Sequence, residues 1–203
     1  MPDANPAPIS SADALAHLTT LPRSTSVLLL GATDSGKTTF VWDATQALLR
    51  AGRTVAVVDC DLGQSEIGPP GTLGVGFAEP TNLDALRSLR HLTPVASYFI
   101  GAMSPVRHTL DVCVGACQMT RVAKKRRPDV TLIDTCGWTL GPAACRFKRH
   151  LTELLVPHTV FAFARGAELD PLLAPFEHLQ HPDLRRVAVA AEAGRKTTAA
   201  RAT

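Results

Sequence analysis

Long apolar segments are absent from this sequence: no run reaches the roughly 18 residues that a membrane-spanning helix needs. The first residues, MPDANPAPISS, also lack a basic start followed by an apolar stretch, so we expect no secretory signal. Both absences argue against a membrane partner. They predict a soluble, intracellular protein of the cytoplasm, or of the nucleus if the source is eukaryotic.

Paired cysteines are absent as well. The five cysteines form an odd set without the C-x-x-C spacing of structural zinc sites, which favours reduced thiols. The seven histidines are scattered without a ligand pattern, so none is assigned a catalytic role. The sequence therefore indicates neither a disulfide framework nor a structural zinc site.

The composition is that of one globular domain. Apolar residues make up 45% and charged residues 19% of 203 residues, which suits an α/β domain with a core. Residues 1–100 carry six Lys/Arg against nine Asp/Glu, whereas residues 101–203 carry fifteen against nine. The basic second half fits an anionic partner. It equally fits composition drift, because Arg outnumbers Lys sixteen to five.

Short apolar runs alternate with longer amphipathic stretches along the chain. The expected strands are 26–30, 54–59, 95–100, 130–134, 159–164 and 186–190. The expected helices are 37–51, 83–92, 110–126, 142–155 and 172–179. Because the strands are nearly all apolar rather than alternating, we expect helices to cover both of their faces. The alternation predicts a three-layer α/β fold with a mostly parallel sheet.

The two ends of the chain differ from its middle. Residues 1–24 are rich in Pro, Ala, Ser and Thr, so we expect a flexible N-terminal lead-in with one short helix near 12–18. Residues 25–203 form the expected single domain. Its last expected strand is followed only by a short tail, which suggests a domain truncated at its C-terminus or a fragment of a longer design.

A phosphate-binding loop is the strongest signal in the sequence. The run SVLLLG leads straight into ATDSGKTT, which completes the P-loop pattern G-x-x-x-x-G-K-[ST] between a buried strand and a helix. Its glycines let backbone amides curl around phosphate, and the helix N-terminus adds positive potential. We expect Lys37 to reach the β- and γ-phosphates of ATP and Thr38 to ligate Mg²⁺, in a P-loop NTPase fold. The expected ATP-binding residues are Gly31, Ala32, Thr33, Asp34, Ser35, Gly36, Lys37, Thr38 and Thr39.

Two expected strands end in acidic residues, as a site for Mg²⁺ and a triphosphate requires. The first segment, VAVVDCDLGQ, carries Asp59 and Asp61, followed by Gln64. One carboxylate can hold metal-bound water while the other accepts a proton from an attacking hydroxyl, and the amide can orient a nucleophile. We therefore expect the metal ligands Thr38, Asp59 and Asp61, and the catalytic residues Lys37, Asp61 and Gln64. Either acid alone would also fit a loop-capping role.

The second segment, VTLIDTCGW, places Asp134 three residues before Gly137, the pattern with which a GTPase marks its γ-phosphate switch. A GTPase-like switch is therefore an alternative function, although no Asn-Lys-x-Asp stretch that could read guanine is present. Trp138 follows directly, on a loop that should face the phosphates. Its indole can stack on a nucleic-acid base, or it can be a half-buried packing residue, as tryptophans usually are.

Together these segments resemble the P-loop polynucleotide 5′-hydroxyl kinases, which include the RNA kinase of the pre-mRNA cleavage complex and the kinase that processes ribosomal RNA. The resemblance is carried, in family order over roughly residues 26–165, by GATDSGKTTF, VVDCDLGQSEIGPPGTLG, YFIGAMSP, TLIDTCGW and FKRHLTELLVP. Several motifs in register are more specific than any one of them. On this resemblance, residues 25–203 are a P-loop kinase domain.

The resemblance implies transfer of the γ-phosphate of ATP to a 5′-hydroxyl end of RNA or DNA, with Mg²⁺ as cofactor. By matching motif, Asp61 organises the metal water and activates the hydroxyl, while Thr135 and Trp138 clasp the terminal nucleotide. Family members also carry an arginine-bearing lid just after the region where this sequence stops. Arg195 and Arg201 are candidates for it, or belong to a solvated tail. A nucleotide-binding protein with an incomplete lid and no kinase activity is therefore a further alternative.

Overall fold

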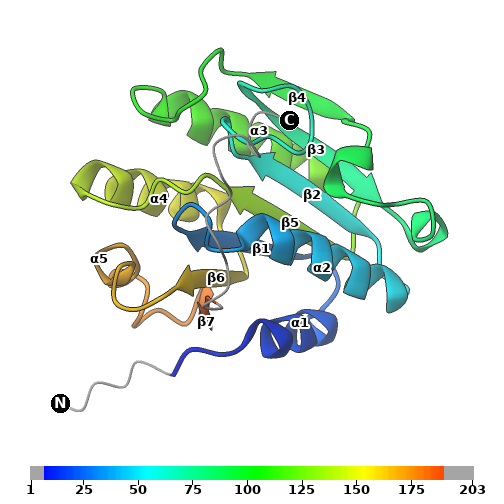
Figure 1. The fold of residues 1–203 in the computed structure, drawn as a ribbon, viewed down its shortest axis with the longest axis horizontal. Helices are drawn as coiled ribbons and strands as arrows, with labels where there is room; N and C mark the ends of the chain where they lie inside the picture. The colour runs from blue at the N-terminus through cyan, green and yellow to red at the C-terminus, as the bar shows by residue number, and fades with distance from the viewer. Residues whose placement is uncertain (1–6, 190–203) are drawn as a thin grey trace.

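A computed structural model of the protein describes residues 7–189 and contains one seven-stranded sheet, in the order β4-β3-β2-β5-β1-β6-β7 (Figure 1). The strands are β1 (Thr25–Gly31), β2 (Val55–Cys60), β3 (Thr72–Ala78), β4 (Ala96–Phe99), β5 (Val130–Thr135), β6 (Thr159–Ala164) and β7 (Asp183–Ala188). The helices are α1 (Ser11–Thr20), α2 (Lys37–Arg50), α3 (Thr109–Lys125), α4 (Pro142–Leu155) and α5 (Asp170–Leu173). Five strands pair in parallel, while β3 and β4 extend the sheet antiparallel beyond β2.

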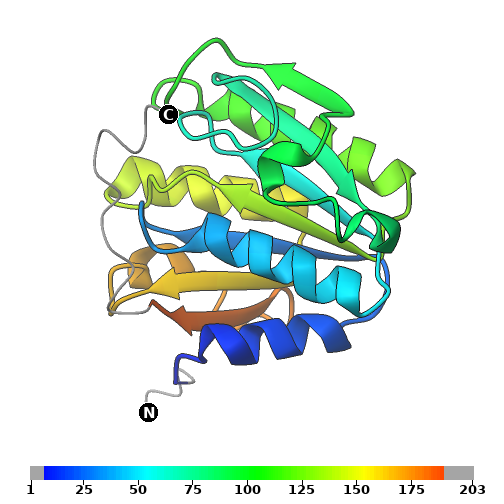
Figure 2. The ribbon, with the colours of Figure 1, turned by 45° about the vertical axis from the view of Figure 1, so that its right-hand side comes forward.

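Helices cover both faces of the sheet, because successive apolar side chains of the central strands point to opposite sides. In β1, Val27 and Leu29 join the core under α1 and α2, while Leu28 and Leu30 join the core under α3, α4 and α5. Figures 1 and 2 show α1 and α2 on one face and α3 and α4 on the other. The predicted three-layer α/β P-loop fold with a mostly parallel sheet is confirmed.

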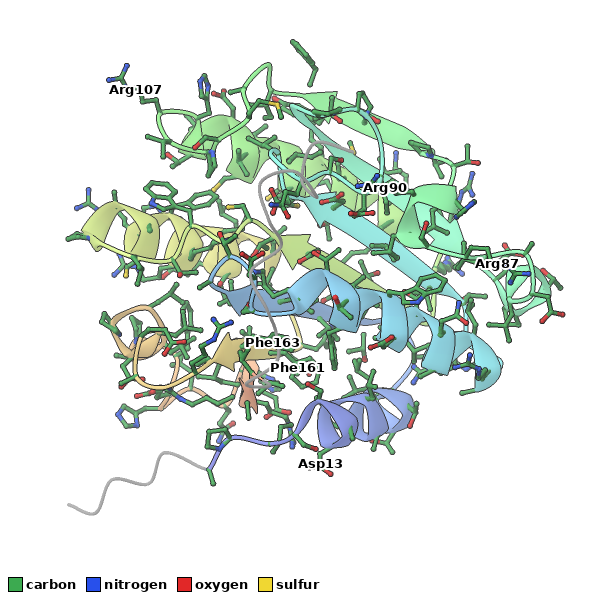
Figure 3. All side chains as sticks on the ribbon, in the orientation of Figure 1. Asp13, Arg87, Arg90, Arg107, Phe161 and Phe163 are labelled. Atoms are coloured by element: carbon green, nitrogen blue, oxygen red, sulfur yellow. The ribbon has the colours of Figure 1, made fainter. Side chains whose placement is uncertain are left out.

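Aromatic packing fixes α2, and with it the phosphate loop, against the sheet. Phe40 of α2 meets Phe161 and Phe163 of β6 edge to face, with ring centroids 5.6 and 5.1 Å apart. Figure 3 labels Phe161 and Phe163. Edge-to-face pairs at this spacing add to the stabilisation from burial alone. The start of α2 is thereby held to the strand that flanks β1.

Two predicted helices are wrong, and one predicted strand is present with other bounds. The expected helix at 83–92 is replaced by two single turns of 3₁₀-helix, Pro80–Asn82 and Leu89–His91, flanking an irregular stretch. Leucines of this segment close the end of the α2-side core, so burial rather than helix propensity decides its path. The expected helix at 172–179 is only the short α5, because Pro171 favours its first turn while Pro175 opposes its continuation. The expected strand at 186–190 begins earlier, at Asp183.

The outer edge of the sheet also differs from expectation. The segment of β3 carries Gly74 and Gly76 and was not expected as a strand. The strand expected at 95–100 is present as β4, but it is not covered on both faces: its residues alternate between half-buried and exposed. Phe99 is 77% exposed. Within the described part of the chain, β4 pairs with one strand only, so it is an edge strand.

Residues 7–24, expected as part of a flexible lead-in, are packed into the domain. Ile9 forms a parallel bridge with Val187, and α1 begins at a capping box in which Ser10 and Asp13 satisfy each other's backbone amides. Ala14 and Leu18 of α1 are buried against the sheet. This packing gives the short helix a tertiary partner that composition does not reveal. No helix within residues 7–189 has the length and apolar character needed to cross a bilayer.

Candidate nucleotide and substrate site

The phosphate loop lies between β1, which ends at Gly31, and α2, which begins at Lys37. Its curl depends on left-handed backbone at Asp34 (φ 58°) and at Gly36 (φ 87°), the residue that precedes the helix. Such φ angles are unstrained for glycine and tolerated by aspartate. The loop therefore has the backbone shape that directs amides toward a phosphate at a helix N-terminus.

A cavity of about 480 Å³ opens above this loop. The phosphate loop forms one wall, the segment after β2 a second, the segment before α3 a third, and the segment after β5 a fourth. The lining residues are Thr33, Asp34, Ser35, Gly36, Lys37, Thr38, Thr39, Asp61, Gly63, Gln64, Met103, Ser104, Pro105, Cys136, Gly137 and Trp138. The structure thus brings most of the predicted site residues around one cavity, called below the phosphate pocket.

Lys37 is buried, and its ammonium donates to the carbonyl oxygens of Gly31 and Ala32 at 2.9 and 2.8 Å. Burial lowers the pKa of Lys37, and the carboxylate of Asp134 acts in the opposite direction. The lysine therefore lies inside the curl of the loop, bonded to it.

Asp134 lies at the junction of the phosphate loop and β5. One of its oxygens accepts the Thr38 hydroxyl at 2.7 Å, and the other accepts the backbone amide of Thr135 at 2.9 Å. Burial raises the pKa of Asp134, while Lys37 and the Thr38 hydroxyl lower it. A hydroxyl and a carboxylate in contact beside a phosphate loop are the oxygen ligands that Mg²⁺ prefers. The expected metal set did not include Asp134, although its position at the end of an apolar strand beside β1 was a usable signal.

Asp59, an expected metal ligand, does not line the phosphate pocket. One of its oxygens accepts the amide of Asp61, and the other accepts the amides of Glu66 and Ile67 and the hydroxyl of Ser65. These bonds fold the loop after β2 back over the strand, which is the loop-capping role. Burial and the neighbouring Asp134 raise the pKa of Asp59 to about 7.

Asp61 lines the phosphate pocket on the wall formed by the segment after β2, together with Gln64. Its Oδ1 accepts the backbone amides of Gly63 and Gln64 at 3.0 and 3.2 Å, which fixes the carboxylate at the pocket edge. The position suits a base that meets a hydroxyl arriving from the side of the pocket away from the loop.

The two residues expected to clasp a nucleotide are placed differently. Thr135 is buried, and its hydroxyl donates to the carbonyl of Leu29 at 2.7 Å, so it links β5 to β1 rather than lining the pocket. Trp138 is partly buried and lines the pocket, with its indole stacked on Phe147 at 5.9 Å between centroids and 26° between planes. A Cβ on Gly137 would collide with the backbone of Thr33, so this segment packs directly on the phosphate loop.

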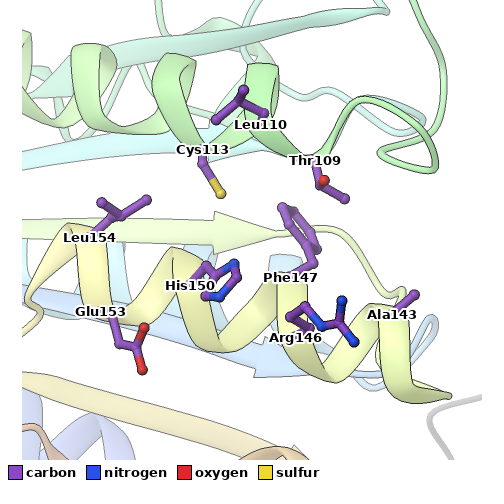
Figure 4. Close-up of a pocket in the computed structure, with 9 residues that line it drawn as sticks. All are labelled: Thr109, Leu110, Cys113, Ala143, Arg146, Phe147, His150, Glu153 and Leu154. Atoms are coloured by element: carbon purple, nitrogen blue, oxygen red, sulfur yellow. The ribbon is translucent and has the colours of Figure 1, made fainter.

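Phe147, which stacks on Trp138, also lines a second hollow between α3 and α4, about 480 Å³ in volume (Figure 4). Its wall carries apolar and cationic side chains, among them Leu110, Leu154 and Arg146. Nothing in the sequence had singled out this groove. The expected lid residues Arg195 and Arg201 lie outside the described residues.

The comparisons with known proteins agree with the geometry. The sequence model of the mRNA cleavage and polyadenylation factor CLP1 P-loop family matches residues 31–202. The chain belongs to this CLP1 P-loop family. The predicted resemblance is thereby confirmed.

Curated proteins with similar sequences carry a kinase name. The chain is 33% identical over 162 residues to the polyribonucleotide 5′-hydroxyl-kinase PH0197 of Pyrococcus horikoshii, covering 80% of this chain and 43% of that protein. It is 35% identical over 152 residues to the polyribonucleotide 5′-hydroxyl-kinase MJ1315 of Methanocaldococcus jannaschii, covering 75% and 40%. The chain therefore spans less than half the length of these relatives.

A solved CLP1 structure has the same fold. The wild-type Clp1p–Pcf11p complex superposes with a TM-score of 0.66 at 12% identity, over 94% of this chain and 49% of that one. At this identity the likeness supports the fold alone.

Proposed function

We propose that this chain is the catalytic core of an ATP-dependent polynucleotide 5′-hydroxyl kinase that acts on RNA. The observation that carries the proposal is that one pocket holds both halves of the reaction. The Thr38–Asp134 contact lies beside the phosphate loop, and Asp61 and Trp138 line other walls of the same pocket. The names of the curated relatives support a ribonucleotide polymer as the acceptor.

The nucleotide half of the reaction rests on the loop residues. The loop amides and Lys37 bind the β- and γ-phosphates of ATP. Among the described residues, no three His, Cys, Asp or Glu side chains gather to hold a metal ion by themselves. Mg²⁺ bound with phosphates needs only one or two protein carboxylates, so Thr38 and Asp134 fit it, and Asp61, which lines the same pocket, would bind its water. Bound there, Mg²⁺ would neutralise charge on the β- and γ-phosphate oxygens.

The acceptor half of the reaction rests on the pocket walls formed by the segments after β2 and β5. The 5′-oxygen attacks the γ-phosphorus in line with the bond to the β-phosphate oxygen, which breaks and releases ADP. Asp61 accepts the hydroxyl proton as the new O–P bond forms. Gln64 orients the hydroxyl, and Trp138 stacks on the terminal base. Arg195 and Arg201 remain proposed lid residues that cover the phosphates.

The test is transfer of labelled γ-phosphate from ATP to 5′-hydroxyl RNA and DNA of the same sequence. We expect labelled RNA and no labelling of the same RNA carrying a 5′-phosphate. The chain should be assayed alone and as the full-length protein, because the relatives are longer. GTP hydrolysis without an acceptor would instead support the switch alternative. Nucleotide binding without transfer by either form would support the scaffold alternative.

A further inference from the structure

Lys148 of α4 is wholly buried, with 0% of its surface exposed. No carboxylate among residues 7–189 lies within ion-pair distance of its ammonium. Burying an unpaired ammonium is costly, and an apolar side chain of similar volume would avoid that cost. The position of the charge therefore calls for a role other than packing.

The ammonium of Lys148 donates to the carbonyl oxygen of Cys136 at 2.7 Å and lies 3.5 Å from its sulfur. Cys136 directly follows β5 and precedes Gly137 and Trp138. All three residues line the phosphate pocket. Lys148 thus reaches the pocket wall from the side of the sheet that faces α4, without entering the pocket.

The direction of the Cys136 carbonyl also determines the direction of the Gly137 backbone amide, because the two belong to one peptide group. In residues 7–189 the cis peptide bond is His181–Pro182, so the bond between Cys136 and Gly137 is trans. In a trans peptide the N–H points opposite to the C=O. The carbonyl of Cys136 points to Lys148 in the core, and the amide of Gly137 therefore points away from the core, on the side of the pocket. This amide has no hydrogen-bond partner among the described residues.

We propose that Lys148 is a positioning residue that holds the Gly137 amide as a donor to the terminal phosphate of a bound nucleoside triphosphate. The ammonium orients the peptide and polarises it, which strengthens its N–H as a donor. Contact between Gly137 and Thr33 places this amide next to the phosphate loop. This inference rests on the proposed function in one respect: it requires that a nucleotide binds in the phosphate pocket. It does not require transfer of phosphate to RNA.

The first test compares two nucleotides that differ in the terminal phosphate. We expect Lys148→Met to weaken binding of Mg²⁺–AMP-PNP by about tenfold, the lower end of what a hydrogen bond to a charged group contributes. Affinity for ADP should be unchanged. Lys148→Gln, which keeps a donor without the charge, should lie between parent and Lys148→Met. Lys125→Met, at an exposed position of α3, should behave as the parent.

Thermal unfolding of the Lys148→Met variant distinguishes a role of Lys148 in positioning the Gly137 amide from a role in core packing. Because Lys148→Met removes an unpaired buried charge, the variant should remain folded. Equal losses of AMP-PNP and ADP affinity would show a structural role and overturn the proposal. Unchanged AMP-PNP affinity in a folded variant would overturn it as well.

A second test uses the parent chain, so it does not depend on a variant that folds. Cys136–Gly137 is the only Cys-Gly pair in the sequence. Labelling cysteine carbonyl carbons with ¹³C and glycine nitrogens with ¹⁵N therefore selects a single amide resonance by NMR. We expect its proton to shift downfield with Mg²⁺–AMP-PNP and much less with ADP. The same response to both nucleotides, or none, would contradict the proposal, whether or not the chain transfers phosphate to RNA.

Discussion

The hydroxyl of Thr38 and the carboxylate of Asp134 are 2.7 Å apart and join the start of α2 to the end of β5. This contact links the phosphate loop to the strand end that we propose supplies negative charge for a metal. Asp134 lies on β5, which pairs with β1, and Thr38 lies in the first turn of α2, just after the phosphate loop that follows β1. The contact gives the first prediction.

Asp134→Asn should leave the fold intact and greatly weaken the reaction. The amide keeps an oxygen for the Thr38 hydroxyl but removes the charge that would face Mg²⁺. We expect transfer to fall by about two to three decades, the size of losing one electrostatic stabiliser of a reacting group. Steady-state transfer across a Mg²⁺ titration measures it, with Asp43→Asn on the exposed face of α2 as control. Parental activity of Asp134→Asn at the Mg²⁺ concentration that saturates the parent would show that Asp134 is not a metal ligand.

Asp61→Asn should separate proton transfer from nucleotide binding. If Asp61 accepts the proton of the 5′-hydroxyl, kcat should fall by roughly two to four decades. Affinity for ATP should change far less, because the phosphate loop is untouched. A variant that transfers phosphate at the parental rate would assign the base elsewhere, with Asp134 as the first candidate.

Lys37→Ala should weaken ATP binding by about 10- to 100-fold, as expected for a hydrogen bond to a charged group, and abolish transfer. The fold should survive, because the cation is bonded only to its own loop. Calorimetric ATP binding and circular dichroism measure the two effects. Parental ATP binding and turnover would contradict this role.

Trp138→Ala tests the acceptor side. One base–aromatic stack contributes about 1–3 kcal/mol, so oligonucleotide affinity should fall by that amount while ATP affinity stays constant. Because the indole is only partly buried, the loss of stability should be smaller than the roughly 3–5 kcal/mol of a buried tryptophan. Trp42→Ala is the matched control, since Trp42 is also partly buried but lies on α2, where it packs against the opposite core. Unchanged oligonucleotide affinity in a stable Trp138→Ala protein would argue against stacking.

Asp59→Asn should change how stability depends on pH. The folded-state pKa of Asp59 is raised to about 7, above its value in the unfolded chain. The folded protein therefore binds one more proton than the unfolded chain between about pH 4 and 7, and this site loses stability as pH rises through that window. Asparagine cannot titrate. The stability of the parent relative to the variant should thus fall by about 2–3 kcal/mol between pH 5 and 8. Urea unfolding at both pH values measures it, and a constant difference would show that the pKa is not raised.

Much of the fold could be predicted from the sequence, because local signals and the tertiary structure agree. Strands covered on both faces are continuous apolar runs, and α4 has the bounds 142–155 that its pattern predicts. The glycines of the phosphate loop predict its backbone shape directly from the sequence. By contrast, β3 was missed because Gly74 and Gly76 weaken the strand pattern. Those glycines are needed because Ile67 and Leu92 pack onto the strand there.

The acidic residues show why a site is harder to predict than a strand. Asp59 and Asp134 occupy paired positions on neighbouring strands, so the local pattern cannot rank them. The difference arises because the loop after β2 folds back and donates two amides and a hydroxyl to one oxygen of Asp59. Lys148 was missed for a similar reason: its helix sequence does not reveal that the ammonium ends beneath Cys136.

The position of β4 at the sheet edge has a consequence for local opening. The phosphate loop follows β1 and Asp134 lies in β5, and both of these strands are paired on both sides. The wall formed by Met103, Ser104 and Pro105 follows β4, which within residues 7–189 pairs only with β3. Amide protons of an edge strand exchange through small local openings, while those of central strands require nearly global unfolding. In native-state hydrogen exchange, the amides of β4 should therefore exchange faster than those of β1 and β5. The wall at Met103, Ser104 and Pro105 should open locally while the part of the pocket formed by the phosphate loop stays closed.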